Sequence, residues 1–201
     1  MKWCIPAVRA YTIDHLDPLI QRGVVHPAVA LSFGRRHGIP SWIEPAVRRL
    51  KALPMGTWSA QAHIMCWMTL DTYQIVTRLR EKLHEKRAAL ALPGPRVTHS
   101  DDCQDRTTCS GSWEMSWMFK VGKKLLNPID EWRPTITEIR RAAESIVVPE
   151  MTPLCFGLTM ESVLGSKAWD FEDHGVQKAV ELLMVEEMDV AFAPGGDPMD
   201  I

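Results

Sequence analysis

The sequence predicts an all-α protein, an irregular bundle of about seven to nine helices. Apolar residues recur at spacings of three and four along most of the chain, and the alternation typical of strands is almost absent. Pro and Gly fall between the periodic segments. With 201 residues, 46% of them apolar, the chain can bury a core in one or two domains.

The first half of the chain predicts three helices and a short helical turn. Pro6 and Pro27 suit first-turn positions, and Gly38 suits the residue that closes a helix. In "PSWIEPAVRRLKAL", Ser41 is a candidate N-cap, and apolar residues recur at helical spacing behind it. The expected segments are residues 5–16, a turn at 18–21, residues 26–38, and a helix from Ser41 that ends before Pro54.

The longest predicted helix covers residues 69–90. It has an apolar stripe, and Arg78 to Arg87 supply a charged face of alternating sign, which we interpret as solvated. "LPGPR" at residues 92–96 stops helix formation and is the best candidate for a boundary. We therefore predict a helical region at 1–92 and a Cys/His-containing helical region at 93–190.

The second half predicts four helices and a disordered end. The helices are expected at residues 109–126, 135–145, 153–164 and 172–187. Residues 191–201 close the chain with "APGGDPMDI", a composition too poor in apolar side chains to offset the entropy of ordering. We expect these residues to form a disordered tail.

Charge and hydropathy indicate the cellular compartment and the classes of partner that we expect. The 23 basic and 25 acidic side chains nearly cancel, so no overall field favours nucleic acid or a membrane surface. The N-terminal stretch has no signal-peptide core, and the longest apolar runs fall short of the roughly 20 residues that cross a bilayer. We expect an intracellular protein of the cytoplasm or nucleus, without a nucleic-acid or membrane partner.

One loop concentrates metal-binding residue types. His99, Cys103 and Cys109 fall within "THSDDCQDRTTCSGSW", and they supply three of the four donors that a tetrahedral zinc site requires. Cys109 lies near the start of a predicted helix, where the helix dipole favours a thiolate. The fourth ligand must come from elsewhere, and Cys155 is the better candidate. His174 is the weaker one, because it lies between Asp173 and Gly175 and is expected to face solvent.

Spacing alone leaves three interpretations of this loop open. The thiols could bind zinc, could be small buried side chains, or could form a Cys103–Cys109 disulfide, which a reducing compartment disfavours. The total of five cysteines is odd and also argues against a disulfide framework. Cys4 and Cys66 lie in apolar helical patterns and are predicted to be core residues.

Several motifs together resemble a known family. "IPSWIEPA" at residues 39–46 combines Pro, Trp and Pro at fixed spacing, and His99, Cys103, Cys109, Trp113 and Trp117 form an "H...C.....C...W...W" pattern. In this order, and over about residues 3–184, the chain resembles the helical C-terminal part of fungal BTB/POZ domain proteins, particularly those of mushroom-forming fungi. The shared His/Cys pattern strengthens the prediction of a structural zinc ion held by His99, Cys103, Cys109 and Cys155.

The resemblance implies an adaptor-like protein with an unidentified protein partner, and two departures qualify it. The chain starts at Met1 inside the helical region of the family, so we expect the BTB fold itself to be missing and do not expect dimerisation through a BTB core. Some relatives carry a CxxC near the fourth ligand, whereas Leu158 stands at that position here. At most four ligands remain, which is a complete structural site without an open position for catalysis.

The predicted function is therefore a non-enzymatic protein-interaction module with a structural zinc site. The alternatives are a zinc-dependent enzyme and a nucleic-acid-binding protein, but the chain has no H-E-x-x-H, G-x-S-x-G or phosphate-loop motif and no basic face. Among eight tryptophans, Trp113 and Trp117 are predicted core residues. Trp132 and Trp169 lie among charged residues and form a candidate exposed contact pair.

Overall fold

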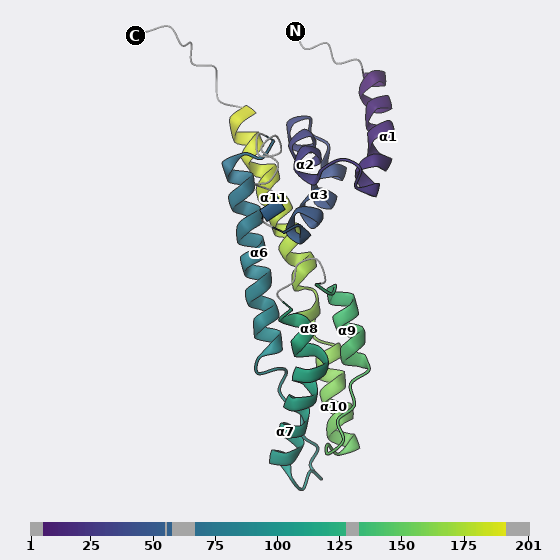
Figure 1. The fold of residues 1–201 in the computed structure, drawn as a ribbon, viewed down its shortest axis with the longest axis vertical. Helices are drawn as coiled ribbons and strands as arrows, with labels where there is room; N and C mark the ends of the chain where they lie inside the picture. The colour runs from purple at the N-terminus through teal and green to yellow at the C-terminus, as the bar shows by residue number, and fades with distance from the viewer. Residues whose placement is uncertain (1–5, 55, 58–66, 128–132, 192–201) are drawn as a thin grey trace, which may run out of the picture. The chain divides into compact units, whose positions relative to one another are not determined.

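Helices make up most of the part of the chain that the structure describes. The computed structural model describes residues 6–54, 56–57, 67–127 and 133–191, with the backbone alone from residue 186. No strand occurs in these ranges, so the predicted all-α class is confirmed (Figure 1). None of the helices described in these ranges is both long enough and apolar enough to span a bilayer. The predictions for Cys4, Cys66, Trp132 and residues 192–201 lie outside them.

The chain divides into two compact units. One contains residues 1–79 and 176–201, and the other contains residues 80–175. The division falls inside two long helices, α6 (Leu70–Ala91) and α11 (Phe171–Ala191). The predicted domain boundary between residues 92 and 93 stays a prediction, and the candidate metal ligands all belong to the second unit.

The first helix of the first unit is longer than predicted. Helix α1 (Pro6–Arg22) is continuous through Pro18, so the prediction of a helix at 5–16 followed by a separate turn was wrong. Arg49 donates to the carbonyl oxygens of Ile20, at 2.6 Å, and of Gln21. These bonds add to the one that the carbonyl oxygen of Ile20 accepts from the amide of Gly23, and they hold the end of α1 in place.

Helices α2 (Pro27–Arg36) and α3 (Pro40–Ala52) agree with the predicted segments. His26 caps α2 by accepting from the amide of Ala28, and Gly38 follows the helix with a φ of 60°, which favours glycine. The N-cap of α3 is Ile39, with Pro40 in the first helical position, so the prediction of Ser41 as N-cap was wrong. Pro40 has the φ of a helical residue, so the helix begins ahead of Ser41 and includes it.

Helix α6 agrees with the predicted long helix, but one member of its charged face is buried. Arg87 is only 5% exposed, and it forms an ion pair with Glu172 and donates to the carbonyl oxygen of Pro134 at 3.2 Å. The prediction that Arg87 is solvated was therefore wrong. Its partners come from segments far away in the sequence, and helical periodicity carries no information about them.

The second unit is built on a helix with a local change of winding. Helix α7 (Arg106–Trp117) continues through the π-helical turn η1 (Met118–Gly122) into α8 (Lys123–Leu125), where the amide of Lys123 donates to the carbonyl oxygen of Met118. Buried side chains recur every fourth residue along it: Cys109, Trp113, Trp117, Val121 and Leu125. At 3.6 residues per turn such a series drifts by about 40° per step, and the wider π-turn reduces the drift.

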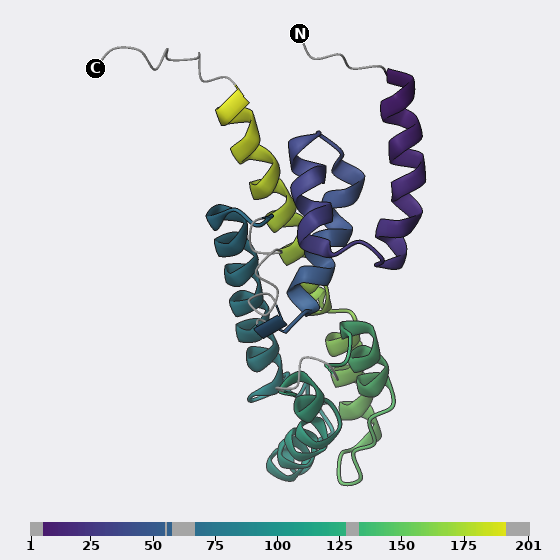
Figure 2. The same ribbon diagram turned by 45° about the horizontal axis from the view of Figure 1, so that its top comes forward.

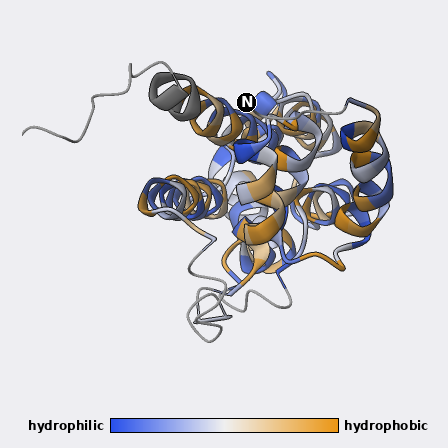
Figure 3. Cartoon of the chain, turned by 90° about the horizontal axis from the view of Figure 1, so that it is seen from above, coloured by the Kyte–Doolittle hydropathy of each residue, from blue (hydrophilic) through white to orange (hydrophobic). Residues whose placement is uncertain are grey.

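Three further elements cover the buried face of α7. Helix α9 (Ile136–Glu144) begins with a capping box between Thr135 and Glu138, and α10 (Pro153–Leu164) begins where predicted. The short η3 (Lys167–Trp169) leads into α11. Figures 1 and 2 both show α9 and α10 beside the α7 to α8 segment. Hydrophobic and hydrophilic residues alternate around the helices, as Figure 3 shows.

We predict that Arg87→Ala lowers the free energy of unfolding by about 3–5 kcal/mol, because it removes one member of the buried ion pair with Glu172. Urea titration followed by circular dichroism measures the change. The exposed neighbour Lys82 provides the control, and Lys82→Ala is expected to change stability by less than about 0.5 kcal/mol. Equal effects of the two substitutions would contradict the role assigned to the ion pair.

Candidate metal centre

Four potential metal ligands from three parts of the second unit converge at one point. The ring of His99 and the thiols of Cys103, Cys109 and Cys155 place one donor atom each within 4.8 Å of all the others. The three cysteines are free thiols. His99 and Cys103 come from the loop before α7, Cys109 from the first turns of α7, and Cys155 from the first turn of α10. The predicted convergence is confirmed, while the binding of a metal stays a prediction.

Cys109 is positioned by the start of α7. Asp105 caps this helix, since its carboxylate accepts from the amide of Thr108 at 2.9 Å and from the Thr108 hydroxyl at 2.7 Å. These bonds lower the pKa of Asp105 below its usual value. Cys109 is 1% exposed and lies on the same helix face as Trp113, so the core that buries the tryptophan also fixes the thiol.

Cys155 is positioned in the same way by α10. Pro153 occupies the first position of this helix, and Cys155, the third residue, is fully buried. Four residues later and on the same face, the buried Thr159 accepts from the amide of Thr98 at 3.0 Å and donates to its carbonyl oxygen at 3.4 Å. Thr159 therefore fastens the loop to α10 one residue before His99.

Further hydrogen bonds orient the donor groups in the loop. The amide of Ser100 donates to Sγ of Cys155 at 3.2 Å, and its hydroxyl lies 3.4 Å from the same sulfur. Nδ1 of His99 lies 3.5 Å from Sγ of Cys103, while Nε2 lies 3.2 Å from the hydroxyl of Ser110. With Nδ1 facing the thiols and Nε2 bonded outward, the ring has the orientation of a metal-ligating histidine with an outer-shell partner.

The donor set and its spacing fit zinc. Zn–S bonds of about 2.3 Å and Zn–N bonds of about 2.0–2.1 Å in a tetrahedron place neighbouring donors about 3.5–3.8 Å apart. The 3.5 Å between His99 and Cys103 already has this value. All donor pairs lie within 4.8 Å, which is about 1 Å more than the tetrahedral separation. Small rotations about χ1 remove this difference. Three thiols and one imidazole are also soft and borderline ligands, which bind zinc in preference to magnesium or calcium.

The pKa values of Cys155 and Cys103 are shifted in opposite directions. Hydrogen bonds from the side chains of Ser100 and Thr152 lower the pKa of Cys155 to about 5, although burial acts in the other direction. Burial, followed by the neighbouring sulfur of Cys155, raises the pKa of Cys103 to about 11. The cluster by itself therefore accepts one thiolate and resists the next one. A divalent cation among the sulfurs reverses that resistance, because its charge stabilises every thiolate around it.

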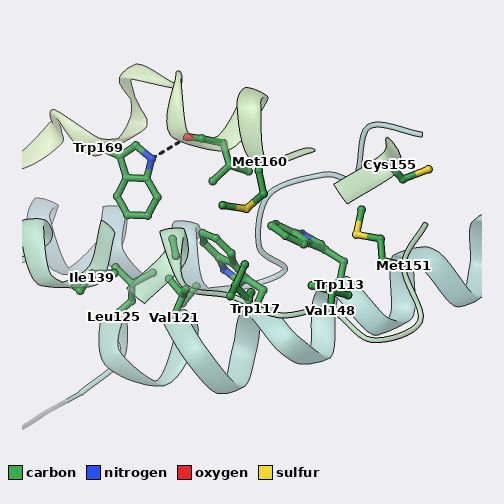
Figure 4. Close-up of a cluster of buried hydrophobic side chains, with 14 of the residues drawn as sticks. Trp113, Trp117, Val121, Leu125, Ile139, Val148, Met151, Cys155, Met160 and Trp169 are labelled. Carbon is green, nitrogen blue, oxygen red and sulfur yellow. Dashed lines mark hydrogen bonds between the residues drawn. The ribbon is translucent and has the colours of Figure 1, made fainter. Parts of the chain in front are cut away.

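A tryptophan layer continues from the cluster into the core (Figure 4). Nε1 of Trp113 donates to the carbonyl oxygen of Pro95 at 2.9 Å, and Nε1 of Trp117 donates to that of Leu90 at 3.1 Å. Gly94 lies against Trp117 with a φ of 88°, and a Cβ there would approach Cδ1 of that ring to 2.7 Å. The predicted core positions of Trp113 and Trp117 are confirmed.

Trp169 belongs to the same layer. It is 4% exposed and donates from Nε1 to the carbonyl oxygen of Val163 at 2.8 Å, so the prediction of an exposed contact at Trp169 was wrong. Of its charged sequence neighbours, Asp170 follows η3 and Glu172 lies in the first turn of α11, and neither indicates the direction in which the ring points.

Sequence analysis missed four residues that support the cluster: Ser100, Ser110, Thr152 and Thr159. Ser100 and Ser110 each adjoin a predicted ligand, which is the place to look for outer-shell hydrogen bonds. Thr159 follows Cys155 at helical spacing, and that spacing alone could have indicated a polar residue on the buried face. His174, the weaker candidate for the fourth ligand, is exposed on α11 and is not part of the cluster.

Comparisons with known proteins do not assign the site. The chain matches no family model, and no curated protein and no solved structure is significantly similar to it. The geometry of the cluster therefore carries the interpretation.

We predict that Thr159→Val destabilises the second unit by about 1–3 kcal/mol, because the amide and the carbonyl group of Thr98 lose their partner while the shape of the side chain is kept. Thermal unfolding followed by circular dichroism measures the loss. Thr137 on α9 is exposed, and Thr137→Val is the matched control with an expected change below about 0.5 kcal/mol. An unchanged stability in Thr159→Val would show that the loop does not depend on this contact.

Proposed function

We propose that the protein is a non-enzymatic, adaptor-like interaction module of the fungal BTB type, whose second unit is held by a structural zinc ion bound to His99, Cys103, Cys109 and Cys155. The observation that carries the proposal is the convergence of these four donors to within 4.8 Å. A tetrahedral set of three sulfurs and one nitrogen is a complete first shell for zinc.

The completeness of the ligand set supports a structural role over a catalytic one. Catalytic zinc usually has three protein ligands and keeps one position for water, with a general base nearby. Here four donors leave no such position. The nearest carboxylate in the sequence that is fixed by described contacts, Asp105, is engaged in capping α7. Asp101 and Asp102 are exposed loop residues.

The task of the zinc ion would be to join segments that lie far apart in the sequence. It would tie the loop at 99–103 to the starts of α7 and α10, two helices whose cysteines are 46 residues apart in the sequence. Both cysteines lie near helix N-termini, where the helix dipole favours the negative charge of a thiolate. Such a site would keep the surface of the second unit in one conformation, which is what a binding module requires.

The adaptor part of the proposal rests on the family resemblance. "IPSWIEPA" at residues 39–46 and the His/Cys/Trp series from His99 to Trp117 carry it. A rigid helical module without a catalytic constellation fits an interaction role. No described feature favours hydrolysis or nucleic-acid binding.

The purified protein is expected to contain one zinc ion per chain, measured by elemental analysis. Cys109→Ser and Cys155→Ser should lose the metal and the cooperative unfolding of the second unit, because the energy of metal binding is folding energy at such a site. Cys4→Ser is the matched control and should keep both. Chelation should destabilise the wild type in the same way as the two substitutions. A metal-free protein whose stability does not change in chelator would contradict the zinc proposal.

Proximity labelling in the source cells tests the adaptor proposal. The full chain fused to a labelling enzyme should reproducibly enrich specific proteins over the labelling enzyme alone. The Cys155→Ser variant should lose this set, since its second unit is not held together. If no protein is enriched over the enzyme alone, the adaptor proposal is wrong, and the zinc measurement still stands separately.

A further inference from the structure

One side of α7 and η1 carries an apolar hollow, and none of the four candidate metal ligands lines it. The hollow has a volume of about 790 Å³ and lies between the helix and the segment at residues 145–150. We call its helical wall, residues 108–120, the α7 face. Most of its large apolar side chains are unusually exposed: Met115 is 65% exposed, Phe119 62%, and Val147 on the opposite wall 78%. Exposed apolar residues that gather in one place mark an interaction site.

The middle of the α7 face is shaped for close approach. Gly111, Ser112 and Ser116 line the hollow together with the large side chains of Met115 and Phe119. Small residues at this spacing let a second helix approach the backbone, and the larger residues supply apolar contact area. The face is therefore suited to a helix, and the charges at its two ends indicate which one.

The two ends of the hollow have opposite charge. Lys120 lines the basic end, and the ammonium group of Lys123 lies 4.2 Å from the ring centre of Phe119. Glu150 lines the other end together with Thr108, to which the carboxylate of Asp105 is bonded. Figure 4 shows the direction, because Met151, which follows Glu150, lies beside Cys155, while Ile139 lies beside Leu125 at the opposite end.

We propose that the α7 face binds a second copy of the same chain in an antiparallel, two-fold arrangement. A two-fold axis that crosses the helix near Met115 brings the acidic end of each copy against the basic end of the other. Glu150 of one copy then faces Lys120 of its partner, and the same pair forms twice. Met115 and Phe119 of each copy enter the hollow of the other. Such self-complementarity is what an isologous interface requires.

The size of the face indicates a weak dimer. From Thr108 to Lys120 the helix extends about 18 Å at 1.5 Å per residue, which is short for a permanent interface. We expect dissociation constants in the micromolar range, so the oligomeric state should depend on concentration. It should also depend on salt, because the pairs at the rim are exposed to solvent and therefore screened.

Sedimentation velocity over a concentration series, up to about 200 µM of the zinc-loaded full chain, tests the proposal. A reversible monomer–dimer equilibrium is expected, and it should weaken when NaCl rises from about 0.05 M to about 0.5 M. Phe119→Ser should raise the dissociation constant by more than about tenfold. Val24→Ser, at a residue of the first unit that is 70% exposed, is the matched control and should leave it unchanged.

Charge reversal gives the decisive comparison. Lys120→Glu and Glu150→Lys should each weaken self-association by about tenfold or more, because each places like charges opposite one another. An equimolar mixture of the two variants should form a heterodimer at least as tight as the wild-type dimer, since both opposite-charge pairs are restored. A chain that stays monomeric at every concentration overturns the proposal. The same result is expected if the α7 face binds a different protein. A dimer that is indifferent to these substitutions overturns it as well.

Discussion

The second unit depends on the meeting of two helix starts. Cys109 lies near the beginning of α7 and Cys155 in the first turn of α10, and both thiols are buried against each other. Each helix continues from its cysteine into the core along one face, with Trp113 following Cys109 and Thr159 following Cys155 at the same spacing of four. The cluster and the core are therefore one continuous layer, and a change in either displaces the other.

Buried thiolates this close repel one another, and the surrounding groups offset only part of that repulsion. The side chains of Ser100 and Thr152, and then the amide of Ser100, stabilise one thiolate at Cys155, while burial and then the neighbouring sulfur of Cys155 raise the pKa of Cys103. Further thiolates require a positive charge between them. This is the physical reason to assign a divalent cation to the cluster, and the bond from Ser110 to the outer nitrogen of His99 is the kind of support that such a ligand receives.

Much of this arrangement could be predicted from residue types and local periodicity. Helical spacing predicted the principal helices, and the chemistry of zinc selected Cys155 as the partner of a loop 46 residues away. What failed depends on contacts that are distant in the sequence. Arg87 is buried because Glu172 and Pro134 reach it, and Trp169 is buried although charged residues surround it in the chain. The π-helical turn between α7 and α8 likewise depends on packing, which composition does not indicate.

X-ray absorption spectroscopy of the zinc-loaded protein tests the central claim most directly, since it reports the atoms around the metal. We expect a shell of three sulfurs at about 2.3 Å and one nitrogen at about 2.0–2.1 Å. A shell dominated by nitrogen or oxygen would contradict the account, because it would place the metal away from His99, Cys103, Cys109 and Cys155.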